Sequence, residues 1–473
     1  MIPPTGTHVR VPGCTRSAAL VVLAILALLA GAFVPRQLRA AEQAGSGTIE
    51  GRVLNVDTGD YILNARVSVP GTTLEALTNS FGEYRITGVP AGETTVKLSY
   101  IGQPEENKTV SVSAGAVATA DFSIGAAARD GVLSLEKYVV TTTRESDSRA
   151  IAINEQRYSA NLKNVVSTDE FGAVTEGNVG EFAKYIPGVN VDYNAADART
   201  ISVRGLPSSN TPVTIDGFPV ASAASSSATR TFELEQVSIN NTSRLELSKV
   251  PTPDVSASAL GGSINLVSKS AFERSRPLFS YRAYTSMNSN AKTLSKTPGP
   301  GRAPSRKVTP GFDVTYINPV NKNFGFAINA LYSEQYNSQF RSQMQWAPTG
   351  LGVANITPEN PYLARWLVQD APKFTTRYSL GTKIDWRIAA NDVLSFGVQY
   401  NDYDGDFGGS NIQWDAGSTP TFGPNFTQGR NNAGNVTIGT NFRHKYGNTI
   451  TPTLSYTHTG PVWKINAGLS YSR

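Results

Sequence analysis

Few residues of this chain are of the types that usually carry out covalent chemistry. Histidine occurs only at His8, His444 and His458, and the single cysteine is Cys14. A zinc peptidase needs clustered His and Glu ligands, and the sequence has no His-Glu-x-x-His run. It also has no Gly-Lys phosphate loop and no nucleophile elbow. We therefore predict no enzymatic activity, no catalytic residue, no metal site and no cofactor.

Two charged residues stand out because each is followed by a glycine. Arg204 precedes Gly205, and Asp216 precedes Gly217. Each pair ends a short run in which apolar and polar residues alternate, as in a strand. An opposite-charge pair at neighbouring strand ends can brace a domain, although a partly exposed ion pair usually has a small net effect. The glycines are turn formers under either interpretation.

Aromatic side chains in the long polar connections suggest a second kind of chemistry. Trp346, Trp366 and Trp414 can bind sugars or aromatic ligands by stacking. The alternative, which we favour, is that they are surface aromatics of a membrane girdle.

The elements that would position these residues are strands with two different faces. In the run 378–387, Tyr378, Leu380, Ile384 and Trp386 alternate with polar residues and Gly381. Successive strand side chains point to opposite faces, so each such run makes one apolar face and one polar face that suits contact with water. About eight runs of this kind follow residue 277, each near the length that a tilted strand needs to cross a bilayer. We predict part of an antiparallel transmembrane β-barrel over 277–473.

The lengths of the connections support a barrel over a soluble sandwich. Long connections at 289–308, 337–375 and 404–435 alternate with short ones at 318–323, 389–392 and 445–449. Outer-membrane barrels have long external loops and tight periplasmic turns, whereas a soluble sandwich does not explain the alternation. The tight connection at 459–461 should be long by this rule and is not.

The N-terminus predicts export. Arg10 and Arg16 precede an almost wholly apolar run at 18–34, which is typical of a signal peptide over 1–40. An uncleaved anchor is the alternative, but the run is slightly short for a spanning helix. Cys14 precedes the apolar run, so we expect no lipidation and no cysteine after cleavage. The positive charges are dispersed, which argues against nucleic acid as a partner.

Two further regions lie between the signal and the barrel. Residues 45–125 contain short strands separated by Gly/Pro turns, which indicates a β-sandwich. Residues 150–272 are mixed α+β. In that region Val179, Phe182, Ala183 and Ile186 are spaced as on a short amphipathic helix that Pro187 ends.

The sandwich resembles the carboxypeptidase regulatory-like domain. The resemblance rests on the turn at 79–84 and on the Gly-Val-Pro-Ala-Gly stretch at 88–92. It implies a prealbumin-like fold with a structural or partner-docking role, and it does not imply peptidase activity.

The rest of the chain resembles the TonB-dependent outer-membrane receptors. The helix and Pro-Gly-Val turn at 178–189, the strands ending at Arg204-Gly205 and Asp216-Gly217, and the segment 259–266 are similar to the plug domain of that family. Val203 replaces the family's Ile, and Ser256-Ala257-Ser258 stand where the family often has a Tyr-Gly pair. The resemblance implies a plug over 150–272, in which the Arg204–Asp216 pair braces the plug inside a wet lumen. The plug motif residues are then Arg204, Gly205, Asp216, Gly217, Gly261 and Gly262.

The segment 135–144 carries an isolated β-prone run flanked by linker and charge. On its residues alone, pairing with a partner's sheet edge and serving as the first strand of the next domain are equally good interpretations. It looks like a TonB box, which implies recruitment of a TonB-type energy-coupling protein. The residues concerned are Glu136, Lys137, Tyr138, Val139, Val140 and Thr141.

These resemblances imply an outer-membrane receptor with its N-terminal domain in the periplasm. It would take up a siderophore, cobalamin, an oligosaccharide or a similar ligand through a plugged barrel, driven by the inner-membrane proton-motive force. The alternative is an outer-membrane binding or adhesion protein without transport. The family's barrel has many more strands than this chain supplies, so we expect a truncated product or a fragment, which could also be nonfunctional. The other partners are outer-membrane lipid and an unknown ligand.

Overall fold

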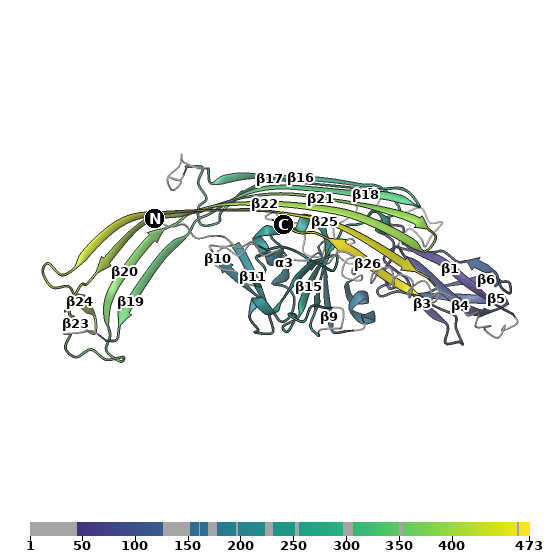
Figure 1. Cartoon of the computed structure of the whole chain (residues 1–473), viewed down its shortest axis with the longest axis horizontal. Coiled ribbons are helices and arrows are strands. Elements are labelled where there is room, and N and C mark those ends of the chain that lie inside the picture. The colour runs from purple at the N-terminus through teal and green to yellow at the C-terminus, as the bar shows by residue number, and fades with distance from the viewer. Residues whose placement is uncertain are drawn as a thin grey trace, which may run out of the picture. The chain divides into compact units, whose positions relative to one another are not determined.

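The computed structural model describes residues 45–125, 152–159, 161–168, 177–194, 197–222, 230–250, 255–296, 306–349, 353–460 and 463–473 (Figure 1). The expected signal peptide and the segment 135–144 lie outside these described residues. The described parts are dominated by strands and form a β-sandwich, a mixed α+β domain and a long antiparallel sheet. The predicted fold class is therefore confirmed.

The sandwich consists of two four-stranded sheets. One contains β1 (Ser46–Asn55), β4 (Glu83–Pro90), β7 (Val117–Thr119) and β8 (Phe122–Ile124). The other contains β2 (Arg66–Ser68), β3 (Glu75–Leu77), β5 (Gly92–Ser99) and β6 (Glu106–Val112). Because its strands alternate, inward residues such as Ile49, Val53, Val96 and Leu98 form a continuous apolar core.

The mixed domain is built on a five-stranded sheet. Its strands, in spatial order, are β13 (Phe218–Pro219), β12 (Val213–Ile215), β15 (Ser263–Ser268), β14 (Thr242–Ser248) and β9 (Lys163–Ser167). A hairpin of β10 (Val189–Asn194) and β11 (Asp197–Val203) lies beside α3 (Val179–Ala183) and two single-turn helices, η2 (Ser208–Asn210) and η3 (Leu234–Gln236). Two further single-turn helices, η4 (Ile239–Asn241) and η5 (Ala271–Glu273), contact the long sheet.

The helix α3 forms where its apolar spacing predicts. The Asn178 side chain caps it by accepting a hydrogen bond of 2.8 Å from the Gly180 amide. Val179, Phe182 and Ala183 are buried in the core of the mixed domain, together with Ile186 just beyond the helix. The helical pattern stops before Pro187, which cannot continue it.

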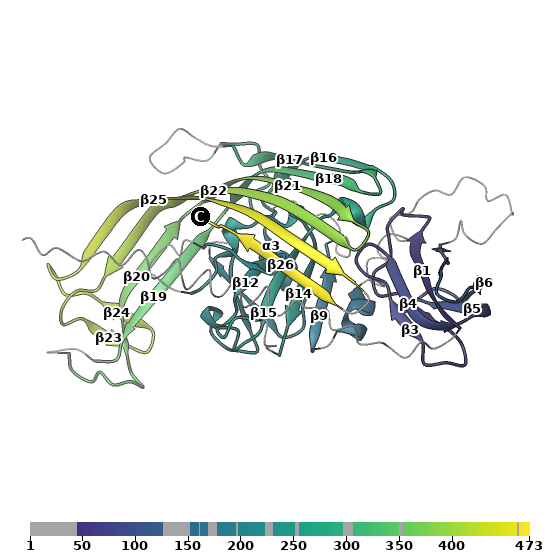
Figure 2. The ribbon, with the colours of Figure 1, turned by 45° about the vertical axis from the view of Figure 1, so that its right-hand side comes forward.

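The long sheet has nine strands, shown side by side in Figure 2. They are β16 (Leu278–Met287), β17 (Val308–Asn321), β18 (Phe324–Asn337), β19 (Phe340–Ala347), β20 (Tyr362–Asp370), β21 (Lys373–Ala389), β22 (Asp392–Asp415), β25 (Asn435–Thr459) and β26 (Lys464–Ser470). Neighbouring strands of this sheet pair antiparallel throughout the described residues. A separate hairpin of β23 (Thr421–Gly423) and β24 (Phe426–Gln428) lies in the connection between β22 and β25.

One predicted turn is wrong. Residues 445–449 belong to the continuous strand β25, because each pairs with a residue of 401–405 on β22. Partner hydrogen bonds thus override the turn-like Gly447-Asn448 sequence. With β25 continuous, the short connection at 459–461 no longer departs from the alternation of long and short connections. The connection from β25 to β26 now falls on the same side as the tight turns after β17 and β21, where short connections are expected.

In the long sheet the apolar side chains are exposed and the polar side chains are buried, which is the reverse of a soluble domain. On β21, Leu380 is 46% exposed and Trp386 is 53% exposed, whereas Ser379 is 4% and Asp385 1% exposed. We call the first side the apolar face and the second the polar face. No helix within the described ranges combines the length and the apolar character that crossing a membrane requires.

Candidate functional site

The polar face of the long sheet contacts the mixed domain through hydrogen bonds. Asn241 donates from Nδ2 to Ser379 Oγ at 2.9 Å, and Gln399 donates from Nε2 to Ser268 Oγ at 2.9 Å. Gly381 permits this close approach, because a Cβ there would lie 2.4 Å from the Asn241 side chain. Polar groups of both partners meet here, which makes this interface the candidate functional site.

A buried ion cluster lies at one end of the interface. Asp197 of β11 contacts Lys373 and Arg377 of β21, and its Oδ1 lies 3.2 Å from Arg377 Nη2. The Asp197 and Lys373 side chains are fully buried, and that of Arg377 is 4% exposed. Burial raises the pKa of Asp197, but the charges of Arg377 and Lys373 outweigh it and hold the pKa below its ordinary value.

The same cluster extends to a third strand of the long sheet. Lys445 of β25 contacts Glu233 at 2.7 Å and also contacts Glu235 of η3. Tyr403 of β22 lies between these groups and donates from its hydroxyl to Asp197 Oδ2 at 3.4 Å. The Lys373 ammonium lies 4.5 Å from the Phe407 ring centroid. Acidic groups of the mixed domain therefore meet basic and aromatic groups of the sheet.

The expected ion pair between Arg204 and Asp216 does not form, although both residues are described. Arg204 donates to two backbone carbonyls, from Nη2 to Lys249 at 2.5 Å and from Nε to Gly261 at 3.1 Å. The reason is local geometry: Arg204 and Asp216 each occupy the first position of a separate tight turn, with φ of 56° and 51°. The two side chains leave those turns toward different partners.

Asp216 instead links the mixed domain to the long sheet. Its Oδ2 lies 3.3 Å from Lys383 Nζ of β21, and its Oδ1 accepts from the Ser268 amide at 2.8 Å. The residue that the sequence singled out thus does brace the interface, with a partner that the sequence did not suggest.

The four glycines named from the sequence take turn or close-packing positions. Gly205 and Gly217 follow the two turn residues with φ of 75° and 84°. The second turn joins β12 to β13 as a two-residue hairpin loop, for which Asp-Gly is a preferred pair. Gly262 has a φ of 139°, and a Cβ there would lie 2.8 Å from the Ser248 carbonyl oxygen. Gly261 accepts the Arg204 hydrogen bond.

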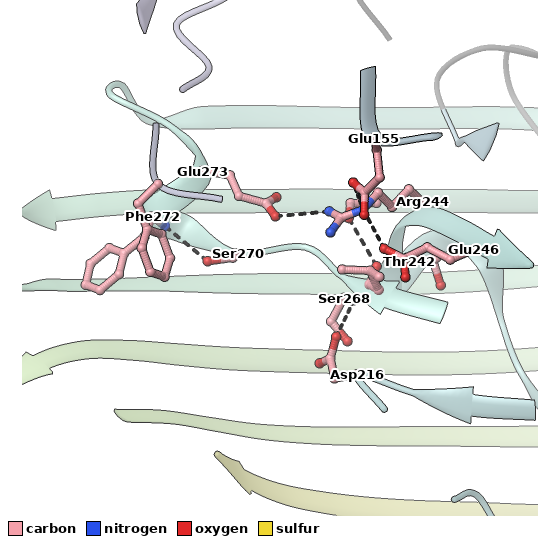
Figure 3. Close-up of polar contacts among 12 residues, drawn as sticks. Glu155, Asp216, Thr242, Arg244, Glu246, Ser268, Ser270, Phe272 and Glu273 are labelled. Atoms are coloured by element: carbon pink, nitrogen blue, oxygen red, sulfur yellow. Dashed lines mark hydrogen bonds and ion pairs between the residues drawn. The ribbon is translucent and has the colours of Figure 1, made fainter. Parts of the chain in front are cut away.

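A second charged cluster lies inside the mixed domain, centred on Arg244 of β14 (Figure 3). Arg244 Nε lies 3.2 Å from Glu155 and 3.0 Å from Glu246, and its Nη1 lies 3.6 Å from Glu273. Burial lowers the pKa of Arg244, but the three carboxylates outweigh it and raise the pKa above its ordinary value. Burial raises the pKa of Glu273 to about 7, against the charge of Arg244. Glu273 is therefore the member of this cluster that changes charge near neutral pH.

The sandwich also contacts the long sheet and the segment that leads into it. Arg387, at the end of β21, lies 2.9 Å from Glu83 of β4. Arg274, which follows η5, lies 2.6 Å from Asp60 of the sandwich. Arg387 further lies over the Phe81 and Phe272 rings, which pack edge to face at 5.6 Å.

The remaining candidates are weaker. Asp404, Asp406 and His444 offer ligand atoms within 4.8 Å of one another and are the group that could hold a metal ion within the described ranges. Trp366 and Trp414 stack on each other with centroids 5.0 Å apart, on β20 and β22. A cavity of about 10 Å³, lined by Asn241 and other interface residues, is large enough for roughly one water molecule.

Sequence reasoning missed most of the interface residues. Asp197, Lys373, Arg377 and Lys445 are common surface types that no motif marks. Lys373 and Arg377 carry one local signal, because they continue the polar side of the alternation in β21, whereas Lys445 lies in a run predicted as a turn. Only the structure shows that the mixed domain covers the polar face.

Comparison with known proteins gives two domain matches. Residues 155–263 match the TonB-dependent Receptor Plug Domain, and residues 48–125 match the carboxypeptidase regulatory-like domain. The mixed domain is a TonB-dependent receptor plug. We call it the plug from here on. No curated protein matches the chain.

Two of the solved structures to which the chain is similar are a ferric enterobactin receptor and a ferric-catecholate import receptor. A mutant ferric enterobactin receptor of Pseudomonas aeruginosa is 14% identical over 68% of this chain and 49% of its own, with a TM-score of 0.36. The ferric-catecholate import receptor of Escherichia coli K12 is 16% identical over 66% of this chain and 47% of its own, with a TM-score of 0.36. The chain thus spans about half the length of these structures.

Proposed function

We propose that this chain is part of an outer-membrane TonB-dependent receptor that takes up a ligand past its plug. The observation that supports the proposal most is a plug domain held against the polar face of a long antiparallel sheet whose other face is apolar and exposed. A sheet with this inverted pattern is stable where lipid covers its outer face. We accordingly place the protein in the outer membrane, with the sandwich on the periplasmic side.

The contacts at the interface suggest how the plug is held and released. Asp197 and Asp216 pair with basic residues of β21, so polar contacts fix the plug beside one small apolar cluster that joins η5 to β17 and β18. Polar contacts can be exchanged for contacts with water, which lowers the cost of displacing the plug. In our proposal a TonB-type partner adds a strand to the segment 135–144 and pulls the plug aside, using the inner-membrane proton-motive force.

Deleting residues 136–141 tests this proposal. The deletion should leave assembly into the outer membrane unchanged and abolish energised accumulation of ligand. Cells would be tested with an iron(III) catecholate complex, cobalamin and an oligosaccharide, which represent the ligand classes expected. A scrambled sequence at 126–131 is the matched control. Accumulation that survives the deletion would contradict the role of this segment.

The second candidate is a binding or adhesion protein without transport, which the exposed aromatic residues of β20 and β22 favour. A protonophore separates the two candidates. Ligand accumulation that collapses with the proton-motive force supports transport, whereas surface binding that is unaffected supports adhesion.

A further inference from the structure

One strand of the long sheet carries a row of positive charges on its polar face. Lys373, Arg377, Lys383 and Arg387 all lie on that face of β21 and span roughly 45 Å of strand. We call these four residues the basic row. Asp385 is the one acidic residue on the same face, and it accepts hydrogen bonds from Ser270, Ala271 and Ser395.

The charges of the row are specific to β21. Along the paired length, the polar-face positions of β18 and β22 are uncharged, and they include Asn329, Ser333, Gln399 and Asn401. A single charged track flanked by neutral polar strands therefore runs along this part of the sheet.

Each cation of the row meets a carboxylate from outside the long sheet. Lys373 and Arg377 contact Asp197 of the plug, and Lys383 contacts Asp216 of the plug. Arg387 contacts Glu83 of the sandwich. The neutralising groups thus sit on the parts that must move if the plug is drawn away from the sheet.

Removing those carboxylates leaves Asp385 as the one carboxylate on the same face of β21 for four cations. Buried or half-buried cations without partners are costly, so water and anions must take the place of Asp197 and Asp216. A ligand with carboxylate, phosphate or catecholate oxygens can pair with each cation in turn, whereas a cationic ligand is repelled.

We propose that the basic row is an anion-conducting track, and that the ligand carried past it is anionic. This inference rests on the proposed function. The plug carboxylates occupy the positions that ligand anions would take in the displaced state. The Phe407 ring beside Lys373 and the Tyr403 ring beside Arg377 offer flat surfaces for an aromatic part of such a ligand.

The ion selectivity of the open pore tests the proposed track, and this test does not require the ligand to be known. The whole receptor that contains this chain would be reconstituted in a planar bilayer, and the plug loosened with urea while the barrel stays folded. The reversal potential in a potassium chloride gradient then reports the chloride-to-potassium permeability ratio. We expect this ratio to exceed one and to fall by at least about twofold toward one in the variant Lys373→Gln/Arg377→Gln/Lys383→Gln.

Two comparison proteins make the result specific. The control variant Lys292→Gln/Lys296→Gln/Lys322→Gln removes the same charge from exposed connections and should keep the wild-type ratio. The conservative variant Lys373→Arg/Arg377→Lys/Lys383→Arg should keep it as well. A ratio that favours potassium, or that the glutamine variant leaves unchanged, would overturn the track and leave the proposed function standing. A protein that never conducts once the plug is loosened would overturn both.

Discussion

At the scale of single residues, the interface depends on buried charged side chains whose partners lie far away in the sequence. Asp197 is enclosed by Lys373, Arg377 and Tyr403, so its carboxylate serves two cations at once. A buried ion pair of this kind adds little stability compared with well-packed apolar residues, but removing Asp197 takes away the carboxylate that two buried cations share.

The substitution Asp197→Asn should therefore loosen the plug strongly. We expect it to lower the free energy of plug unfolding by about 3–5 kcal/mol, because Lys373 and Arg377 lose their counter-charge. Pulse proteolysis of the plug across a urea series measures this change. Asp192→Asn on the neighbouring strand β10, where the side chain is exposed, is the control and should change the value by less than about 0.5 kcal/mol. Equal effects of the two substitutions would contradict the importance of the buried cluster.

Glu273 should make plug stability depend on pH. Its pKa lies above the ordinary value of 4.5, at about 7, so between these values the folded plug binds more protons than the unfolded one. The contribution to stability is complete below about pH 4.5 and is lost as pH rises to about 7. Arg244 and Lys383 favour the charged form, whereas Asp385 and Asp60 oppose it.

The test compares urea unfolding of the wild type with that of Glu273→Gln between pH 4 and pH 8. The stability difference between the two proteins should change across this window and level off above about pH 7. A difference that stays constant with pH would show that Glu273 does not titrate there.

At the scale of elements, alternation predicted the strands and their faces but not all their ends. Tyr378, Leu380 and Trp386 are all exposed, as expected for side chains of the apolar face of β21. The run 445–449 reads locally as a turn because Gly and Asn favour turns. Its pairing with β22 is a tertiary interaction, which single-sequence reasoning cannot weigh.

The connections between strands are also predicted incompletely from the sequence alone. The stretch 337–375 looks like a loop, because its polar residues hide the alternation of β19 and β20. Likewise Asp216 contacts Lys383, which lies 167 residues away along the chain. The identity of a long-range partner is fixed by how the plug meets the sheet, which no local pattern encodes.

The exposure of the apolar face leads to a prediction for β21. Leu380→Lys should reduce assembly into the outer membrane, because a lysine facing lipid near mid-strand costs about 2–4 kcal/mol. The measure is the fraction of protein that resists urea extraction from outer membranes. Leu294→Lys, in the connection after β16 where Leu294 is 87% exposed, should assemble as the wild type does. Equal assembly of both variants would mean that Leu380 faces water.

At the scale of the whole molecule, ion pairs connect the sandwich, the plug and the long sheet, together with small apolar contacts such as that between Phe81 and Phe272. The sandwich and the plug each have their own apolar core, whereas the contacts between parts are made by pairs such as Arg387–Glu83 and Lys383–Asp216. Parts built in this way can separate without unfolding. This is the property that displacement of a plug requires.

The most direct test of the account is to fasten the plug to the sheet. Asn241→Cys and Ser379→Cys place two thiols where the native side chains hydrogen bond at 2.9 Å, and the only natural cysteine is Cys14 in the expected signal peptide. The two thiols would be joined in cells by a short, reducible thiosulfonate cross-linker. Each single-cysteine variant, treated in the same way, is the control.

The measured quantity is energised accumulation of whichever ligand the wild-type cells take up. The account predicts that accumulation stops in the cross-linked double variant and returns when a reductant cleaves the cross-link. Accumulation at the wild-type rate while the plug is still fastened to β21 would contradict it.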